Sequence, residues 1–543
     1  MRLTRRARLA GVALIASVGL TLAACGGDGG DDGASSTDAV ITANSTEPQN
    51  PLVPTATNEV GGGNVIDLLF AGLVAYEKDG SSTNDVADSI TSDDNKVWTV
   101  TLKDGQKFSD GSPVTASSFV DAWNYGALST NAQLGSYFFY PIAGFEDVQA
   151  KDPKTTTMSG LKVVDDVTFT IELNQPEADF PARLGYAAFF PLPESAFDDM
   201  EAYGEDPVGN GPYKLDGKGA WQHDVQIALV PNESYDGVRK PKNGGVTFVF
   251  YTNPDAAYTD VQAGNLDIID QVPPSALATY QDDDTVQAFA EPGSVFASFT
   301  IPQSLAGFGN DEEAHLRRQA ISKAINRPEI TDKLFHDSRT PAVDFSSPLM
   351  PGFDDTIPGN DVLKFDAKEA KDLWSQAEDI AAFKGPFTIS YNADGAGNKE
   401  WVEAVVNQIK NNLDIDARAK AYPTFDELRT AVTDRTIGTA FRTSWQPDYP
   451  SVFNYLAPLF QTGAGSNDGD YSNKEFDSLM SQIAGASDED ERYALQSKAQ
   501  EVLFKDLPGI PLWYQNISAA AAKGVDNVVF NWKNKPEYQL ATK

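Results

Sequence analysis

The sequence predicts an α/β fold of several lobes, and three observations lead to this prediction. Apolar residues alternate with strand periodicity in some segments and recur with helical spacing in others, and the two patterns follow each other along the chain. A length of 543 residues is expected to form more than one lobe, since domains average roughly 100–200 residues. Hydrophobic residues make up 41% of the chain, enough for large packed cores, which excludes a wholly disordered protein.

Three segments have a clear strand pattern. Residues 166–173 and 225–229 alternate apolar and polar side chains, as half-buried strands do. Residues 246–251 are more uniformly apolar, which predicts a more deeply buried strand.

A strand, two turns and a helix are expected between residues 97 and 123. Val97–Leu102 has the strand pattern, and Gly105 and Gly111 supply the residue type that tight turns with positive φ require. Thr115 can cap a helix that begins directly after it.

Two further segments have helical spacing. Trp401, Val405, Ile409 and Leu413 recur every fourth residue and so share one helical face. A second apolar stripe lies within residues 316–325, and proline at position 328 discourages its continuation. Both stripes are expected to be core.

The N-terminus has the layout of a secretory signal. A basic stretch precedes an apolar run at residues 9–20, which is too short for a membrane span of about 20 residues. Leu22–Cys25 resembles the lipobox of bacterial lipoproteins, so we expect residues 1–24 to be a lipoprotein signal peptide and Cys25 to be lipidated. An ordinary secretory signal with a coincidental cysteine is the alternative. Residues 25–38, rich in glycine and polar residues, are expected to be a flexible tether. The predicted location is the extracytoplasmic face of the bacterial cell membrane.

Composition excludes several classes of partner and of stabilisation. With 42 Lys and Arg against 78 Asp and Glu, the net charge of −36 disfavours nucleic acid as a partner. A single cysteine cannot form an internal disulfide, and no Cys/His zinc spacing is present.

The sequence offers no motif for catalysis or for a cofactor. Three histidines give few candidates for a catalytic triad, and neither a phosphate-binding loop nor a zinc-protease motif is present. The acidic run at residues 467–470 does not fit a calcium loop, and we expect a solvated loop there. We therefore expect no metal, no cofactor and no enzymatic activity, although abundant carboxylates leave a surface-anchored hydrolase as an alternative.

An ordered set of short motifs resembles the family 5 solute-binding proteins, the oligopeptide- and dipeptide-binding lipoproteins of ABC importers. The most recognisable motif is VWTVTLKDGQKFSDG at residues 97–111, followed by Val114-Thr115-Ala116. The other stretches similar to that family occur in its order at residues 50–54, 69–74, 209–215, 263–267, 316–321, 324–327 and 508–512.

The resemblance implies a two-lobed fold like that of periplasmic binding proteins, in the class with an extra inserted domain, and with the ligand enclosed between the lobes. Lobe I would combine residues 39–70, 205–295 and 518–543, the inserted domain residues 71–204, and lobe II residues 296–517.

The resemblance also implies a function. The chain would be a monomeric receptor that captures short extracellular peptides and delivers them to an ABC permease and its ATPase subunits. Binding of an oligosaccharide or of a metal chelate by the same fold is the alternative.

Charge indicates where such a peptide would bind. A free peptide is a zwitterion, so a pocket that buries one needs a carboxylate and a cation at opposite ends. Arg442 and Asp448 lie six residues apart, a separation of at most about 20 Å in an extended chain. This stretch is similar to the ligand-binding segment of the family, where Asp448 matches the residue that binds the peptide ammonium and Arg442 one that can bind its carboxylate. Trp445 would line the pocket, and Pro447 departs from the family by having no N–H to offer a ligand.

Overall fold

A computed structural model describes residues 38–57, 59–393 and 397–543. Cys25, the predicted signal peptide and nearly all of the predicted tether lie outside these ranges. Within them, no helix is both long enough and apolar enough to cross a membrane.

One large mixed sheet forms the centre of the described chain, and its strands come from distant parts of the sequence. Its strands are β1 (Val40–Ser45), β8 (Tyr213–Leu215), β9 (Trp221–Gln222), β10 (Gln226–Pro231), β11 (Gly245–Phe250), β12 (Ile268–Ile269), β13 (Val286–Thr300), β14 (Arg339–Pro341), β15 (Phe387–Asn392), β16 (Ala417–Tyr422), β17 (Ala440–Trp445) and β18 (Gly509–Ala522). Their order is β16-β15-β17-β13-β18-β12-β1-β11-β10-β8, with β14 beside β18 and β9 beside β10. The strands expected at residues 225–229 and 246–251 are confirmed as β10 and β11.

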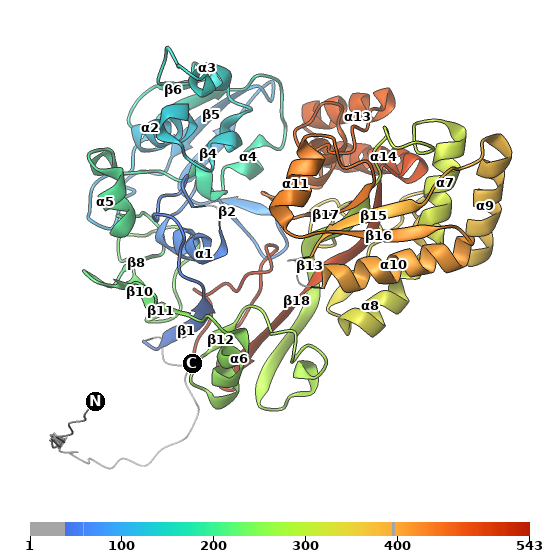
Figure 1. The fold of residues 1–543 in the computed structure, drawn as a ribbon. Helices are drawn as coiled ribbons and strands as arrows, with labels where there is room; N and C mark the ends of the chain where they lie inside the picture. Colours follow the sequence, from blue (N-terminus) through green and yellow to red (C-terminus); the bar gives the residue numbers. More distant parts are fainter. Residues whose placement is uncertain (1–37, 58, 394–396) are drawn as a thin grey trace, which may run out of the picture. The chain divides into compact units, whose positions relative to one another are not determined.

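The two longest strands, β13 and β18, connect the two ends of this sheet and run antiparallel side by side (Figure 1). Their register shifts between Glu291 and Val295, which divides the ladder into two halves. Gly293 lies in this irregular stretch, where an added Cβ would clash with the carbonyl oxygen of Gln515.

Two smaller sheets lie in the segment that was predicted to be an inserted domain. Their strands are β2 (Val74–Tyr76), β3 (Ser82–Asn84), β4 (Ala87–Thr91), β5 (Val97–Leu102), β6 (Leu161–Val163) and β7 (Thr168–Glu172), in the orders β2-β3 and β4-β5-β7-β6. The expected strand, turns and helix are confirmed: β5 is followed by positive φ at Gly105 and Gly111, and Thr115 caps helix α2 through a reciprocal pair with Ser118. The strand expected at residues 166–173 is β7.

Helices pack around these sheets (Figure 1). They are α1 (Val60–Leu69), α2 (Ala116–Ala127), α3 (Phe145–Gln149), α4 (Phe180–Arg183), α5 (Met200–Glu205), α6 (Pro254–Ala263), α7 (Glu312–Lys323), α8 (Arg327–Phe335), α9 (Ala367–Ile380), α10 (Asn398–Leu413), α11 (Phe425–Thr433), α12 (Phe453–Phe460), α13 (Lys474–Gly485) and α14 (Glu489–Asp506). The predicted apolar face of α10 is buried from Trp401 to Leu413. Helix α7 ends at Lys323, and Pro328 lies in the first turn of α8, where its missing N–H costs nothing.

Two large apolar cores divide the described chain. One is built from residues 41–286 and 520–541, and the other from residues 296–514 together with Trp532. The cores separate near the irregular stretch of β13, so the fold has two lobes joined by one sheet. The segment 71–204 shares the first core. The exact bounds of the lobes stay a prediction.

The second core contains a buried cation that the apolar stripe did not predict. Arg327 is 1% exposed, and its guanidinium donates to the carbonyls of Pro511 (2.8 Å) and Leu363 (2.6 Å) and to Ser322 Oγ (2.9 Å). Burial lowers the pKa of Arg327 to about 9. Carbonyl dipoles take the place of a carboxylate, and the guanidinium thereby ties α8 to β18.

Candidate functional site

The segment that follows β17 carries the carboxylate predicted to bind a ligand. The backbone N–H of Asp448 donates to Asn454 Oδ1 (2.8 Å), and Asn454 Nδ2 donates back to Asp448 Oδ2 (3.3 Å). This reciprocal pair fixes the turn between β17 and α12. The Asp448 side chain is therefore held in place before any ligand arrives.

Burial dominates the electrostatics of Asp448. It raises the pKa of this carboxyl group above its ordinary value, whereas the hydrogen bond from Asn454 and the charges of Arg183 and Lys533 lower it. The charge of Asp448 in turn contributes to raising the pKa of Tyr137 and of Tyr186, for which burial is the larger cause. The carboxylate thus interacts electrostatically with tyrosines of the segment 71–204, which shares the first core.

An ammonium group, that of Lys533, lies close enough to this carboxylate to lower its pKa. Lys533 Nζ is 5.2 Å from the ring centre of Tyr186, 5.4 Å from that of Trp532 and 5.9 Å from that of Tyr76. Aromatic faces attract cations, more strongly where water is excluded. A carboxylate and several aromatic faces together can therefore stabilise an ammonium ion at this place.

The predicted cation, Arg442, lies on β17 among side chains of the second lobe. Its Nε donates to Asn392 Oδ1 (2.7 Å), and its guanidinium carbon is 5.3 Å from the ring centre of Phe425. Successive side chains of a strand point to opposite faces, so Arg442 and Trp445 point away from each other. Trp445 packs against the second core, and within the described chain its buried indole N–H has no hydrogen-bond partner.

A cavity of about 590 Å³ lies between residues of the two cores. This volume falls within the range of roughly 300–1,000 Å³ that is usual for ligand sites. Its charged and polar lining includes Asp270, His336, Arg339, Glu400, Gln446, Gln515, Lys533 and Lys535. Within the described ranges, Gln446 is the lining residue contributed by the segment 442–448. Asp448, Arg442 and Trp445 do not line it, and Asp448 is related to it through its electrostatic interaction with Lys533, which is a lining residue.

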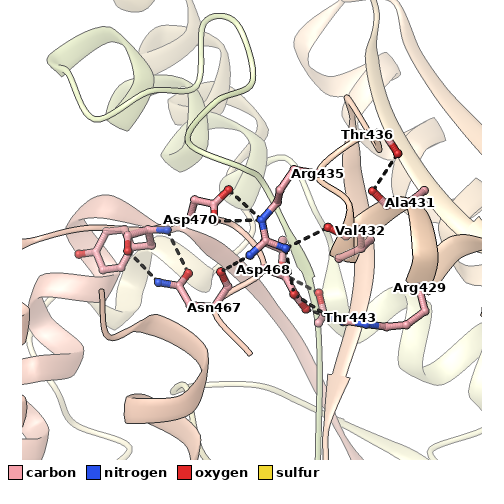
Figure 2. A network of polar contacts seen from close by, with 11 residues as sticks. Arg429, Ala431, Val432, Arg435, Thr436, Thr443, Asn467, Asp468 and Asp470 are labelled. Atoms are coloured by element: carbon pink, nitrogen blue, oxygen red, sulfur yellow. Dashed lines mark hydrogen bonds and ion pairs between the residues drawn. The ribbon is translucent and has the colours of Figure 1, made fainter. Parts of the chain in front are cut away.

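The acidic run at residues 467–470 is not the solvated loop that we expected. Asn467 and Asp468 are buried, and Asp468 accepts two hydrogen bonds from Arg429, at 2.6 and 2.8 Å. Figure 2 shows Arg435 between Asp468 and Asp470, and its Nε is 3.0 Å from an oxygen of Asp470. Two guanidinium groups neutralise these carboxylates, and this arrangement opposes binding of a cation.

Lys533, Arg339 and the three aromatic residues around Lys533 were missed at the level of sequence. Apart from the adjacent Trp532 and Lys533, they come from distant parts of the sequence, and each is an ordinary residue in its local pattern. Spatial proximity is the only property that they share.

Comparison with known proteins places this geometry in context. The family described as bacterial extracellular solute-binding proteins, family 5 Middle, matches residues 83–467. Oligopeptide-binding protein OppA of Bacillus subtilis (strain 168) is 28% identical over 546 residues, which cover 94% of this chain and 96% of OppA. Dipeptide-binding protein DppE of the same organism is 27% identical over 484 residues, which cover 87% of this chain and 86% of DppE.

Solved structures show the same fold. The unliganded open form of the periplasmic murein tripeptide binding protein MppA has a TM-score of 0.81 and 22% identity, covering 94% of this chain and 98% of MppA. Haemophilus influenzae OppA in complex with the peptide RPPGFSPFR has a TM-score of 0.71 and 22% identity, covering 94% of this chain and 99% of that protein.

Proposed function

Because the chain belongs to the bacterial extracellular solute-binding proteins of family 5, we propose that it captures short peptides and delivers them to the permease of an ABC importer. The permease and its ATPase subunits would be separate chains. The relatives named above are binding proteins for oligopeptides, dipeptides and a murein tripeptide. Their names favour peptides over oligosaccharides or metal chelates.

One observation carries the proposal: the partly buried carboxylate of Asp448 interacts electrostatically with an ammonium group that lies against aromatic faces and lines a cavity of ligand size. A free peptide brings such an ammonium at its N-terminus. Asp448 would accept it in a charge-assisted hydrogen bond, which is stronger than a hydrogen bond between neutral groups.

Arg442 is proposed to bind the carboxylate of the shortest ligands, because its planar guanidinium matches a carboxylate with two parallel hydrogen bonds. Asn392 holds its side chain through a hydrogen bond, and Phe425 through a ring contact. Trp445 is proposed to contribute apolar surface next to the ligand.

The site requires no covalent chemistry. Family 5 proteins bind their solutes rather than transform them, and we propose that this chain is likewise not an enzyme. We further propose that it acts as a monomer on the extracytoplasmic face of the bacterial cell membrane, held there by lipid on Cys25.

Identification of the bound molecule tests the proposal. The purified protein is examined by native mass spectrometry. The bound small molecules are then released by denaturation and identified by their masses and fragmentation. We expect intact peptides of a few residues. Recovery of a saccharide or a metal chelate would keep the fold and refute the peptide assignment, and steady conversion of added peptides to fragments would refute a purely binding role.

A further inference from the structure

A buried ion pair of the segment 71–204 lies against the turn that carries Asp448. Glu177 is 6% exposed and Arg183 is 5% exposed, and Nε of Arg183 donates to Oε1 of Glu177. Arg183 is the last residue of α4, and this helix lies on the side of its lobe that faces α13 (Figure 1). Both ions lose their water when they are buried, so such a pair is weak evidence for a purely stabilising role.

The guanidinium of Arg183 contacts the residue that follows Asp448. Its carbon is 4.6 Å from the ring centre of Tyr449, which is 2% exposed. Its Nη2 donates to the hydroxyl group of Tyr140 (3.0 Å), so Glu177, Tyr140 and Tyr449 together fix the planar group. Attraction between a cation and an aromatic face is strongest where water is excluded, as it is here. Arg183 therefore holds the ring of Tyr449 in place.

The same turn is held at a second point. Ser451 Oγ donates to Oδ2 of Asp179 (2.7 Å), the residue that precedes α4. The backbone N–H of Ala178 donates to the carbonyl of Ala484 in α13 (2.7 Å). This short segment therefore contacts the second lobe at two places, the turn after β17 and helix α13.

Arg183 also affects Asp448 through its charge. Burial raises the pKa of Asp448, and the hydrogen bond from Asn454 and the charges of Arg183 and Lys533 lower it. Burial alone would lower the pKa of Arg183, and Glu177 is the first of the groups that raise it, so the guanidinium stays charged. Three tyrosines also respond to the charge of Asp448, and burial keeps them uncharged at neutral pH: Tyr76, Tyr137 and Tyr186. The two cations therefore favour the ionised form of Asp448.

We propose that Arg183 positions Asp448 for the ammonium of a peptide, since its guanidinium holds the aromatic ring next to Asp448 and places a positive charge near that carboxylate. Glu177 holds Arg183 in turn. Arg183 is thus a positioning residue, which acts through Tyr449 and Asp448 rather than by touching the ligand. This inference rests on the proposed function and deepens it, because it gives the segment 71–204 a part in ligand binding.

The test measures the affinities of pentaalanine and N-acetyl-pentaalanine by titration calorimetry between about pH 4.5 and 7.5, a range that covers the titration of a buried carboxyl group. The ratio of the two affinities gives the preference for a free amine. One variant combines Glu177→Gln with Arg183→Gln, which replaces the ion pair by two neutral amides and leaves no unpaired buried charge. A second variant is Arg183→Lys. The matched control is Lys162→Gln, which removes an exposed cation of the same segment.

The double variant should lower the preference for a free amine about 3- to 10-fold, through weaker binding of pentaalanine. Without the charge of Arg183 the carboxylate becomes protonated more easily, so this preference should be lost at a pH about half a unit to one unit higher than in the wild type. Arg183→Lys keeps the charge but not the planar group, so the pH dependence should return to that of the wild type while the preference stays partly reduced. The control should behave as the wild type.

A purely structural role of the ion pair gives a different result. Equal losses for the two peptides, with the pH dependence of the wild type, would refute this inference and leave the proposed function intact. If thermal unfolding shows that the double variant does not fold, Arg183→Lys gives the answer, because an unchanged preference for the free amine in that variant would show that the planar group holds nothing the site needs. A wild type that binds both peptides equally has its ammonium site elsewhere, which refutes this inference but not peptide capture. If the wild type binds neither peptide nor a mixture of random pentapeptides, both the proposed function and this inference are wrong.

Discussion

Replacement of Asp448 by asparagine is the most direct test of how a peptide would be held. The change removes the charge and keeps the shape, and an asparagine oxygen can still accept the hydrogen bond from Asn454. The fold of the turn after β17 should therefore survive. Because burial raises the pKa of Asp448, its ionised form is disfavoured in the free protein, so Asp448→Asn should leave thermal stability at neutral pH unchanged or slightly higher.

The magnitude follows from the surroundings of the carboxylate. A charge-assisted hydrogen bond contributes about 1.5–3 kcal/mol, and removal of one partner of a buried ion pair costs about 3–5 kcal/mol. Asp448 is half-buried before a ligand covers it, so a loss of about 2–3 kcal/mol is reasonable. This corresponds to about a 30- to 150-fold weaker affinity for peptides with a free N-terminus.

Titration calorimetry with a pentapeptide and its N-acetylated form measures this loss. The wild type should prefer the free amine by the same factor, and Asp448→Asn should bind both forms equally. Asp416→Asn is the matched control, because it removes an exposed carboxylate in the same lobe that pairs only with Arg418 in the described chain. If Asp448→Asn binds the free-amine peptide within about threefold of the wild type, the ammonium lies elsewhere and the reasoning from burial and charge is refuted.

Three further predictions concern pH, the strand irregularity and the buried arginine. Burial raises the pKa of Asp448, so this carboxylate should become protonated above the pH range of an ordinary aspartate. Peptide affinity measured by calorimetry should therefore fall as the pH is lowered from about 7 towards 4, and Asp448→Asn should show no such fall. Gly293→Ala places a methyl group against the carbonyl of Gln515 and should destabilise the protein by about 1–3 kcal/mol in thermal unfolding, whereas Gly485→Ala, with open space around the new atom, should not. Arg327→Leu removes the guanidinium that donates to the carbonyls of Leu363 and Pro511 and should cost more than about 3 kcal/mol in urea unfolding, and a cost below about 1 kcal/mol would show that those carbonyls are satisfied by other partners.

Much of the local structure follows from the sequence because it depends on neighbouring residues. The strand at Val97–Leu102, the turns at Gly105 and Gly111, and the cap at Thr115 are set by periodicity and by φ preferences, and the structure has each of them. The topology of the central sheet could not be predicted in this way. It joins β13 to β18 across more than 200 residues of sequence, and no local pattern records that pairing.

In the candidate site, too, local sequence indicates some residues, and only the fold brings the others together. Asp448 is a candidate because the stretch around it resembles the ligand-binding segment of the family, and its role stays a prediction. The aromatic residues around Lys533 could not be predicted, since Tyr76, Tyr186 and Trp532 have no sequence relation to Asp448. The expectation for the acidic run at 467–470 was wrong for a related reason. Arg429, which pairs with Asp468, lies in helix α11, and Arg435, which pairs with Asp470, lies just after that helix. Composition reports how many charges a chain has, and packing decides which of them meet.

Charge balance in the cavity explains why a zwitterion suits it better than an ion of either sign. Arg339, Lys533 and Lys535 line the cavity together with Asp270 and Glu400, and Asp448 interacts electrostatically with Lys533, so charges of both signs are close to balance in the unliganded site. A peptide that is free at both ends preserves this balance, since it adds one charge of each sign at its opposite ends. Acetylation or amidation of one end leaves an unpaired charge in a partly desolvated space, which costs several kcal/mol unless water enters. The two blocked ligands should therefore lose affinity for different reasons at different residues, the acetylated one at Asp448 and the amidated one at a guanidinium.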